Sequence, residues 1–443
     1  MRIDELTIQN FKCFENETFR FDPHFNVVIG RNASGKSSLL DAVAGFASFY
    51  LSGIDDQFYR HVKENEIRTI LKDGQPRKQM PVNFYAKGAI HGIDIDWFDR
   101  RGNDESETPK YTIEDWHINR KPALPDYARD DLKESRKIDG EKVVFPLIVY
   151  YGTVRLLNKE EEVEFFTQKE GVFLAYQNCL NPKISSDVFL SWFKTYEDEV
   201  AKFDQPLDKI FLGIIKDAIS SMVPEWTDIA FSRKEEDLMG TFTDESGTPN
   251  KLPFKSLSDG YRNVIGMVAD MAYRCIQLNP GLKENVLTET DGIVLIDELD
   301  LHLHPEWQRT IVRDLKRIFP KVQFIATTHS PFIIQETEEG ELIKMNAGKI
   351  VSTGGANEYS LEDVAEYIQD VKDPAWSNKK LEMYNSAKKY FELLNELQPG
   401  KGNGELNKIR EELNILGKPY SDNVAYTAFL EQKRFLAEQN LSQ

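Results

Sequence analysis

The feature that constrains this chain most is a glycine-bounded loop set between an apolar run and a helical pattern. Gly30 is followed by four free positions and then by Gly35-Lys36-Ser37. That spacing lets consecutive backbone N–H groups curl round an anion at a helix N-terminus. The apolar run Asn26–Ile29 precedes the loop, and apolar residues recur with a helical period from Leu39 to Tyr50 after it. The stretch therefore predicts a strand, a phosphate-binding P-loop and a helix.

The loop also predicts how a nucleoside triphosphate would be held. We expect Lys36 to reach the β- and γ-phosphate oxygens and the Ser37 hydroxyl to ligate the Mg²⁺ that bridges them. A chance glycine loop is the alternative, but the strand and helix on either side favour the P-loop. The loop residues predicted to bind the nucleotide are Gly30, Asn32, Ser34, Gly35, Lys36, Ser37 and Ser38.

Composition limits the classes of partner. The chain has 443 residues, enough for two or three packed units. A formal net charge of −18 argues against a nucleic-acid coat or a binder of anionic membranes. The three cysteines lie far apart without metal-ligand spacing, so neither a disulfide framework nor a zinc site is expected. No apolar run approaches ~18 residues, and we expect a cytoplasmic protein with no membrane segment.

Apolar patterns predict the remaining secondary structure. Residues 1–29 indicate a strand, a turn at Asp22-Pro23-His24 and a second strand. The looser stretch from about Gly53 to Gly140 favours β-hairpins with exposed loops. Residues from about 170 to 224 are predicted to be helical, with an apolar core face that includes Leu207 and Ile210. A β-like piece with a turn at Thr243–Thr248 follows.

A basic cluster with aromatic neighbours lies within the hairpin region. Basic and aromatic side chains together are compatible with nucleic-acid contact. A solvated helix face explains the same charges, and we favour it. The cluster comprises Arg60, His61, Lys63, Arg68, Lys72, Arg77 and Lys78.

Two apolar strands in the second half end in chemically active residues. The first, from Asp291 to Ile296, leads into Asp297 and Glu298. Asp297 suits the Mg²⁺ shell, and Glu298 suits a general base for the attacking water. The second, from Val322, ends by presenting His329. An isolated histidine is more often structural, but beside the preceding motifs a role at the site is favoured.

Two shorter features leave alternatives open. Ser258-Asp259-Gly260 precedes a helix that we expect to begin near Tyr261; it is either an ordinary capping turn or an anion-binding edge. Arg155 follows the buried strand Val143–Tyr151. It lies either near the ligand crevice of a nucleotide-binding fold or in a surface pairing.

The order of the motifs resembles that of the ABC-type ATPases of the SMC and RecF class. Gly30–Ser37 corresponds to Walker A, Leu257–Gly260 to the signature, and Ile293–Glu298 to Walker B with the catalytic glutamate. Leu299-Asp300-Leu301 corresponds to the D-loop and Thr328-His329-Ser330 to the H-loop. Together these motifs frame residues 1 to about 345.

The resemblance implies an α/β fold of the ABC-type P-loop ATPase head, with a mixed sheet around the P-loop helix, inserted β-hairpins, a helical subdomain and a C-terminal helical region. It implies ATP and Mg²⁺ as ligands, with Ser37 and Asp297 on the metal and Glu298 and His329 as catalytic residues. Heads of this class pair around two nucleotides, so Ser258 and Gly260 are implied to contact ATP in trans within a homo-oligomer.

The motifs divide the chain into four predicted segments. Residues 1–175 form ATPase lobe I, with a β-rich insertion at about 53–140, and residues 176–255 form a helical subdomain with a connecting β piece. Residues 256–355 form lobe II. Residues 356–443 form a C-terminal helical region, with helices expected at Asn378–Leu397 and Ala425–Glu438.

Three departures from the family pattern stand out. Sustained heptads are missing, so no long coiled coil is expected. A clear Q-loop glutamine is missing too, and the strand ending at Gly152-Thr153-Val154-Arg155 takes its place in the order. Ala33 replaces a glycine common in these P-loops.

The stretches Asp300–Gln308, Tyr150–Arg155 and Tyr359–Gln443 resemble the ATPases of the Septu anti-phage systems. This implies an HNH-type partner nuclease, with DNA contacted through that partner, and no nuclease activity of the chain itself. His302 and His304 suggest a metal pair, but Pro305 fits the first turn of a helix and a third ligand at ligand spacing is missing.

Three functions remain open, and so does the role of the tail helices. The chain is either an ATPase head that controls a partner, a RecF-type DNA-repair ATPase acting on DNA, or an assembly scaffold that binds ATP with little turnover. Overall acidity counts against the second. The tail helices either dock the partner or pack on the head.

Overall fold

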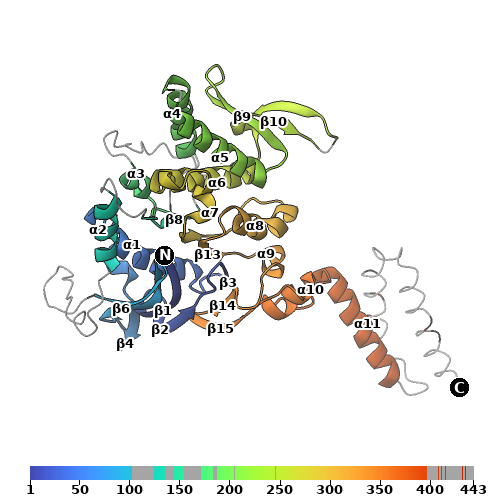
Figure 1. Ribbon diagram of the computed structural model, residues 1–443. Coiled ribbons are helices and arrows are strands. Elements are labelled where there is room, and N and C mark those ends of the chain that lie inside the picture. Colours follow the sequence, from blue (N-terminus) through green and yellow to red (C-terminus); the bar gives the residue numbers. More distant parts are fainter. Residues whose placement is uncertain are drawn as a thin grey trace. The chain divides into compact units, whose positions relative to one another are not determined.

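The computed structural model describes residues 1–101, 124–135, 143–153, 171–182, 187–203, 205–244 and 246–396, together with positions 408, 411, 415, 432 and 435 (Figure 1). The chain divides into two compact units, Met1–Leu361 and Glu362–Gln443. Arg155, most of the predicted helix Ala425–Glu438 and the loop predicted after Arg101 lie outside the described residues.

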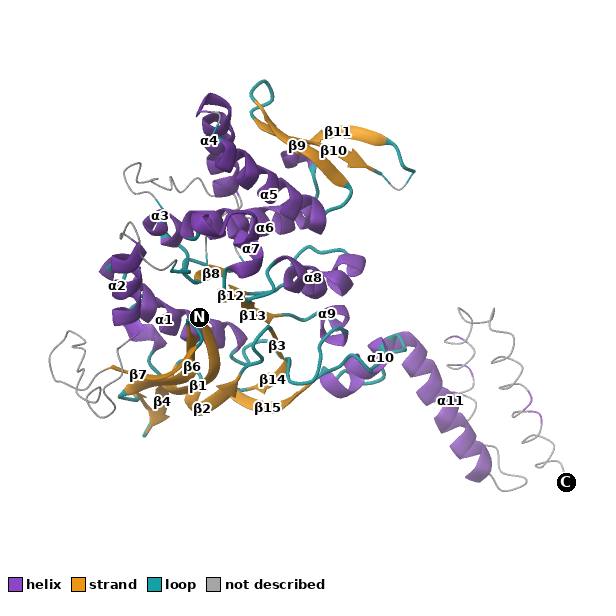
Figure 2. Ribbon diagram, in the orientation of Figure 1, coloured by secondary structure: helices purple, strands orange, loops and turns teal. Residues whose placement is uncertain are grey.

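The centre of the first unit is a six-stranded sheet in the order β15-β14-β3-β13-β12-β8 (Figure 2). Five strands run parallel, and only β15 is antiparallel to its neighbour. Parallel strands covered on both faces read as continuous apolar runs, and β12, β13 and β8 are buried throughout. The strands are β3 Phe25–Gly30, β8 Leu147–Tyr151, β12 Gly292–Ile296, β13 Val322–Thr327, β14 Leu342–Asn346 and β15 Lys349–Gly354.

The P-loop helix α1, Lys36–Leu51, follows β3 as predicted. Leu39, Leu40 and Val43 are fully buried because they recur at helical spacing on the face that packs against the sheet. The carboxyl ends of β3, β13, β12 and β8 meet at one edge of the sheet, where ligands bind in open α/β folds. This edge carries the predicted ATPase motifs.

A second sheet, in the order β2-β1-β6-β7, lies on one side of the central sheet (Figure 1). Residues 1–30 form three strands rather than the predicted two, because a tight turn at Lys12 and Cys13 separates β1 from β2. Lys12 adopts a left-handed φ of 48° there. The strands are β1 Arg2–Phe11, β2 Phe14–Arg20, β6 Val82–Ile90 and β7 Ile93–Arg101.

The predicted hairpin region contains more than exposed hairpins. β6 pairs with β1, so the hairpin β6–β7 is part of the second sheet. A short hairpin, β4 Thr69–Lys72 with β5 Gln75–Lys78, matches the expectation. The helix α2, Leu124–Ser135, was not predicted, because most of its residues are charged or polar.

The predicted helical subdomain is present on the opposite side of the central sheet (Figure 1). Trp192 of α4 stacks on Tyr273 of α6 with ring centroids 4.0 Å apart, which supports assigning the aromatic stripe to the core. Leu207 and Ile210 were placed wrongly in that core face, since they are 37% and 36% exposed on α5. The elements are α3 Val172–Tyr176, α4 Asp187–Phe203, α5 Pro206–Met222 and α6 Asp259–Leu278.

The β-like piece after α5 is a three-stranded antiparallel sheet in the order β11-β10-β9. Its strands are β9 Trp226–Ser232, β10 Asp237–Thr243 and β11 Pro249–Pro253, so the predicted turn joins β10 to β11. Three further α-helices of the first unit are α7 Val286–Glu289, α8 Pro305–Ile318 and α9 Pro331–Gln335.

Helix α10, Leu361–Asp363, lies where the two units meet in the sequence, and the second unit contains α11, Asn378–Glu396, as predicted. The Trp376 and Tyr384 rings make an edge contact with centroids 4.7 Å apart at the start of α11. Within the described part of the chain, every helix is too short or too polar to cross a membrane.

Candidate functional site

The loop between β3 and α1 contains two glycines at positions where a side chain could not be accommodated. Gly30 has φ 153°, and a Cβ there would lie 2.3 Å from the Met345 carbonyl oxygen. Gly35 has φ 106°, and a Cβ there would lie 2.7 Å from Cys13 Sγ. Both positions need glycine for conformation and for space. Ala33, at the position that departs from the family pattern, also has a left-handed φ of 63°.

Lys36 lies at the start of α1 and folds back into the loop. Its Nζ donates to the carbonyl oxygens of Gly30 at 2.8 Å and Arg31 at 3.3 Å. Partial burial lowers the pKa of the Lys36 ammonium, while the carboxylates of Asp297, Glu298 and Asp300 oppose that shift. A phosphate group would give this ammonium a stronger partner than the two carbonyls.

Ser34 carries an unsatisfied hydroxyl inside the loop. The residue is 3% exposed, and its Oγ has no hydrogen-bond partner. The Oγ faces Gly30, since a Cβ on that glycine would lie 2.6 Å from it. A buried hydroxyl without a partner is uncommon in native proteins. An anion seated in the loop would satisfy it.

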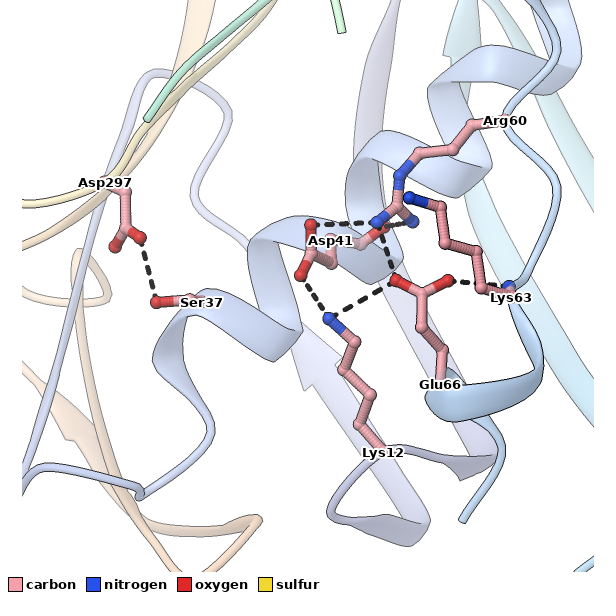
Figure 3. Close-up of polar contacts among 7 residues, drawn as sticks. All are labelled: Lys12, Ser37, Asp41, Arg60, Lys63, Glu66 and Asp297. Atoms are coloured by element: carbon pink, nitrogen blue, oxygen red, sulfur yellow. Dashed lines mark hydrogen bonds and ion pairs between the residues drawn. The ribbon is translucent and has the colours of Figure 1, made fainter. Parts of the chain in front are cut away.

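Ser37 and Asp297 come together although 260 residues separate them in the sequence. Ser37 Oγ donates to Asp297 Oδ2 at 2.9 Å (Figure 3). Thr327 Oγ1 donates to the other carboxylate oxygen of Asp297 at 2.6 Å. A serine hydroxyl beside an aspartate carboxylate is the kind of oxygen pair that holds Mg²⁺ in proteins. The residues present therefore fit the predicted metal site.

Glu298 is held in an unusual backbone conformation next to Asp297. Its φ is 51°, in the left-handed region that a glutamate seldom adopts. Its N–H donates to Thr327 Oγ1 at 2.8 Å, and the next N–H, of Leu299, donates to the Thr327 carbonyl at 2.8 Å. Strain of this kind clusters at functional sites. The side chain is half-buried at the same sheet edge as the P-loop.

The predicted D-loop and H-loop are hydrogen-bonded to each other. Asp300 Oδ1 accepts from Thr328 Oγ1 at 2.5 Å and from the His329 N–H at 3.3 Å. Thr328 is buried, whereas His329 is exposed. The structure thus brings His329 to the carboxyl edge of β13, next to the strand that delivers Asp297 and Glu298.

The predicted signature forms the start of α6, which begins at Asp259, two residues before Tyr261. Ser258 occupies the N-cap position, but its side chain makes no hydrogen bond to the helix, and the residue is exposed. A Cβ on Gly260 would lie 2.4 Å from the His302 carbonyl oxygen, so close packing on the D-loop segment requires glycine there. The trans role of Ser258 and Gly260 stays a prediction.

His302 and His304 lie in the segment that leads into α8. His304 Nδ1 accepts from the Glu306 N–H at 3.4 Å and caps α8, which begins at Pro305 as expected. His302 is exposed with a left-handed φ of 61°. In the described ranges, no three His, Cys, Asp or Glu side chains gather closely enough to hold a metal ion.

The basic cluster is not a helix face, because its first four residues lie in loop segments and its last three lie in the β4–β5 hairpin. Arg60 pairs with Asp41 of α1 at 3.0 Å and with Glu66 at 2.8 Å, and Lys12 pairs with the same two carboxylates (Figure 3). Arg68 also pairs with Glu15, at 3.2 Å. These charges are partly neutralised within the chain, which weakens the case for nucleic-acid contact.

Sequence reasoning missed Thr327, which bonds Asp297, Glu298 and Leu299 at once. The available signal was a threonine at the end of a buried strand, where its hydroxyl can satisfy only groups at the sheet edge. The other predicted residues lie together at the carboxyl edge of the sheet: Lys36, the oxygen pair of Ser37 and Asp297, Glu298 and His329.

The chain is similar to a known protein family and to individual known proteins. A family model described as "AAA domain, putative AbiEii toxin, Type IV TA system" matches residues 25–335. The chain is 26% identical over 401 residues to the retron Vc95 probable ATPase of Vibrio cholerae serotype O1 biovar El Tor, with 78% of this chain and 73% of that protein covered.

Two further similarities are more partial. The Septu protein PtuA of Bacillus mycoides is 27% identical over 348 residues, which cover 77% of this chain and 40% of that protein. Among solved structures, the SMC head bound to the C-winged helix domain of ScpA aligns with a TM-score of 0.46 and 16% identity, covering 80% of this chain and 98% of that one.

Proposed function

Because the chain belongs to this family of AAA domains, we propose that it is an ATPase head that binds ATP with Mg²⁺, pairs with a second copy around the nucleotide and controls a partner effector in anti-phage defence. The retron and Septu relatives support the defence setting, and one of them is named a probable ATPase. The proposal retains the division of the chain into two ATPase lobes, a helical subdomain and a C-terminal partner region.

The observation that carries the ATPase proposal is the contact of Ser37 with Asp297 at 2.9 Å. It joins the end of the P-loop to the end of β12, and it supplies two hard oxygen donors beside the buried Lys36. A bound Mg²⁺ would neutralise the developing charge on the β- and γ-phosphate oxygens. The unsatisfied Ser34 hydroxyl adds a donor inside the same loop.

The roles of the other side chains follow from their positions. Lys36 holds the phosphate end of ATP as a point charge. Glu298 accepts the proton of the attacking water, since its half-buried carboxylate lies one residue beyond Asp297. His329 lies at the end of the adjacent strand, where its imidazole can bond the γ-phosphate or the water. These are the side chains that one copy supplies for hydrolysis in our proposal.

Pairing of two heads completes the site. Ser258 is exposed at the N-terminus of the 20-residue helix α6, and its hydroxyl does not cap that helix. A free helix N-terminus attracts an anion. In the proposed assembly, this end of α6 approaches the phosphates held by the second copy.

The C-terminal unit is the proposed docking region for the effector, for which an HNH-type nuclease is our candidate. Tyr367, Val371 and Tyr384 are 63%, 46% and 44% exposed in it. Tyr367 lies in a π-helical turn and Tyr384 on α11, and aromatic side chains are enriched where proteins bind partners. We assign DNA contact and DNA cleavage to that partner rather than to the head.

ATP turnover by the purified full-length chain, measured with and without Mg²⁺, tests the ATPase proposal. We expect turnover that requires Mg²⁺ and rises with protein concentration as heads pair. Tight ATP binding without any turnover would contradict it and would favour the assembly scaffold.

Pull-down of the adjacent gene product tests docking. The full-length chain should retain that protein, and a folded chain ending at Gly355 should not. Equal retention by both chains would contradict docking through the C-terminal unit, and DNA cleavage by the head alone would contradict the division of labour.

A further inference from the structure

A buried polar contact joins the end of β8 to the signature helix α6. Tyr151 is the last residue of β8 and is 7% exposed. Its phenol donates a hydrogen bond to Asp270 Oδ2 of α6 at 2.7 Å. Burial raises the pKa of this phenol well above its usual value, so the hydroxyl keeps its proton and remains a donor.

Arg274 completes the contact on the side of α6. Its Nε donates to the same Asp270 oxygen at 2.8 Å, and its guanidinium also donates to the carbonyl oxygens of Ala175 and Gln177. Arg274 is almost fully buried and Asp270 largely so. Buried ion pairs of this kind seldom add net stability over an apolar core, and one use for them is to fix a particular arrangement of elements.

The backbone of Tyr151 contacts Asp297, the residue that we propose binds the metal. The Tyr151 carbonyl accepts from the Asp297 N–H at 2.8 Å. Tyr151 therefore bonds Asp297 through its backbone and α6 through its side chain. Ser258 occupies the N-cap position of the same helix twelve positions before Asp270, about 18 Å away along a rigid helix.

We propose that Tyr151 is a positioning residue that couples the phosphate and metal end of the ATP site to the orientation of α6, and so to the pairing of heads through Ser258. The inference rests on the proposed function and adds its route of regulation. A ligand that moves Asp297 moves the Tyr151 backbone, and the phenol transmits that shift because Asp270 and Arg274 hold it. ATP then favours the helix orientation in which Ser258 can meet the second copy.

The contact allows a conservative variant. Tyr151→Phe removes one hydroxyl and keeps the ring, while Arg274 still satisfies Asp270. We expect ATP affinity of a single head to change little. Pairing driven by Mg²⁺ and a non-hydrolysed ATP analogue should weaken about tenfold, the effect of one hydrogen bond to a charged group. Turnover should fall with pairing and recover when protein concentration is raised.

Tyr176→Phe is a matched control. Tyr176 is buried to the same degree, and its hydroxyl donates to the Pro146 carbonyl at 2.7 Å, so the variant loses a buried bond that does not reach α6. We expect Tyr176→Phe to pair normally and to unfold at a thermal midpoint similar to that of Tyr151→Phe. Asp270→Asn is a second variant that keeps an oxygen acceptor for Tyr151 while removing the charge, and we expect intermediate pairing.

Light scattering with and without the analogue measures the pairing of the wild type and of each variant. Unchanged pairing in Tyr151→Phe, beside normal pairing in the wild type, would overturn this inference alone. Equal weakening in Tyr176→Phe would also overturn it, since loss of packing would then explain both. A wild-type chain that binds the analogue but never pairs would overturn the proposed assembly, and the inference with it.

Discussion

The carboxyl edge of the central sheet and the N-terminus of α6 carry the two halves of the proposed ATP site, yet they are built differently. At the sheet edge, Ser37, Asp297 and Thr327 bond one another within a single chain. At α6, Ser258 is exposed and its side chain does not cap the helix. In the proposed assembly, this difference means that one head holds the nucleotide and a second head supplies the end of α6.

The largest expected effect tests the chemistry at the sheet edge. Glu298→Gln should keep ATP binding but lower hydrolysis by about 10²- to 10⁴-fold, the usual contribution of a positioned general base. Single-turnover hydrolysis measures it. Glu306→Gln is the control, because Glu306 is an exposed glutamate in the first turn of α8. Equal losses in both variants would argue against a specific role for Glu298.

The next effect concerns nucleotide binding by the same edge. Lys36→Ala should weaken ATP binding by about a hundredfold or more, because it removes a charge-assisted bond from a site built around an anion. Titration calorimetry with ATP measures the affinity. Arg31→Ala is the control, since Arg31 lies in the same loop with an exposed side chain. Wild-type affinity for ATP in Lys36→Ala would contradict the assignment of this loop as the phosphate-binding loop.

A variant at α6 should leave the sheet edge intact. Ser258→Arg should keep ATP binding and lose ATP-driven pairing by about tenfold or more, because a large cation replaces the hydroxyl at the proposed interface. Light scattering with a non-hydrolysed analogue measures pairing. Ser256→Arg adds the same charge two residues earlier on an exposed serine. If both variants pair like the wild type, the two regions are not halves of one site.

The smallest expected effect is a pH dependence at the sheet edge. Burial lowers the pKa of Lys36, so the free site loses this proton at a lower pH than an ordinary lysine would. ATP binds the charged form, so affinity should fall as pH rises toward that pKa, and binding should take up protons in the alkaline range. Calorimetry in two buffers of different ionisation enthalpy measures the uptake. Lys36→Arg should abolish the dependence, because arginine stays charged.

The P-loop, the helix after it and the acidic ends of β12 could be predicted because their signals are local. Glycine spacing and helical periodicity place Gly30 to Tyr50 without reference to the rest of the chain. The pairing of β6 with β1 could not be predicted, since strand alternation says which face is buried but not which strand lies beside it. The roles of the site residues and the boundaries of the four segments stay predictions.

Tertiary contacts explain what sequence reasoning missed at the site. Thr327 and Tyr151 each bond groups from a different strand or helix, so their importance emerges only once the sheet is assembled. The basic cluster was assigned to a helix face because charge spacing alone cannot detect partners. Arg60 meets Asp41 and Glu66 only after the turn that follows α1 has folded back.

Mixing two inactive variants tests the central claim, that each ATP site is shared between two heads, most directly. Lys36→Ala should lack a working P-loop, and Ser258→Arg should lack a working α6 edge. In a mixed pair, one site combines the intact P-loop of one copy with the intact Ser258 of the other. The account predicts that equal amounts of the two variants recover ATP turnover up to roughly a quarter of the wild-type rate. Turnover that never exceeds the sum of the two variants alone would contradict it.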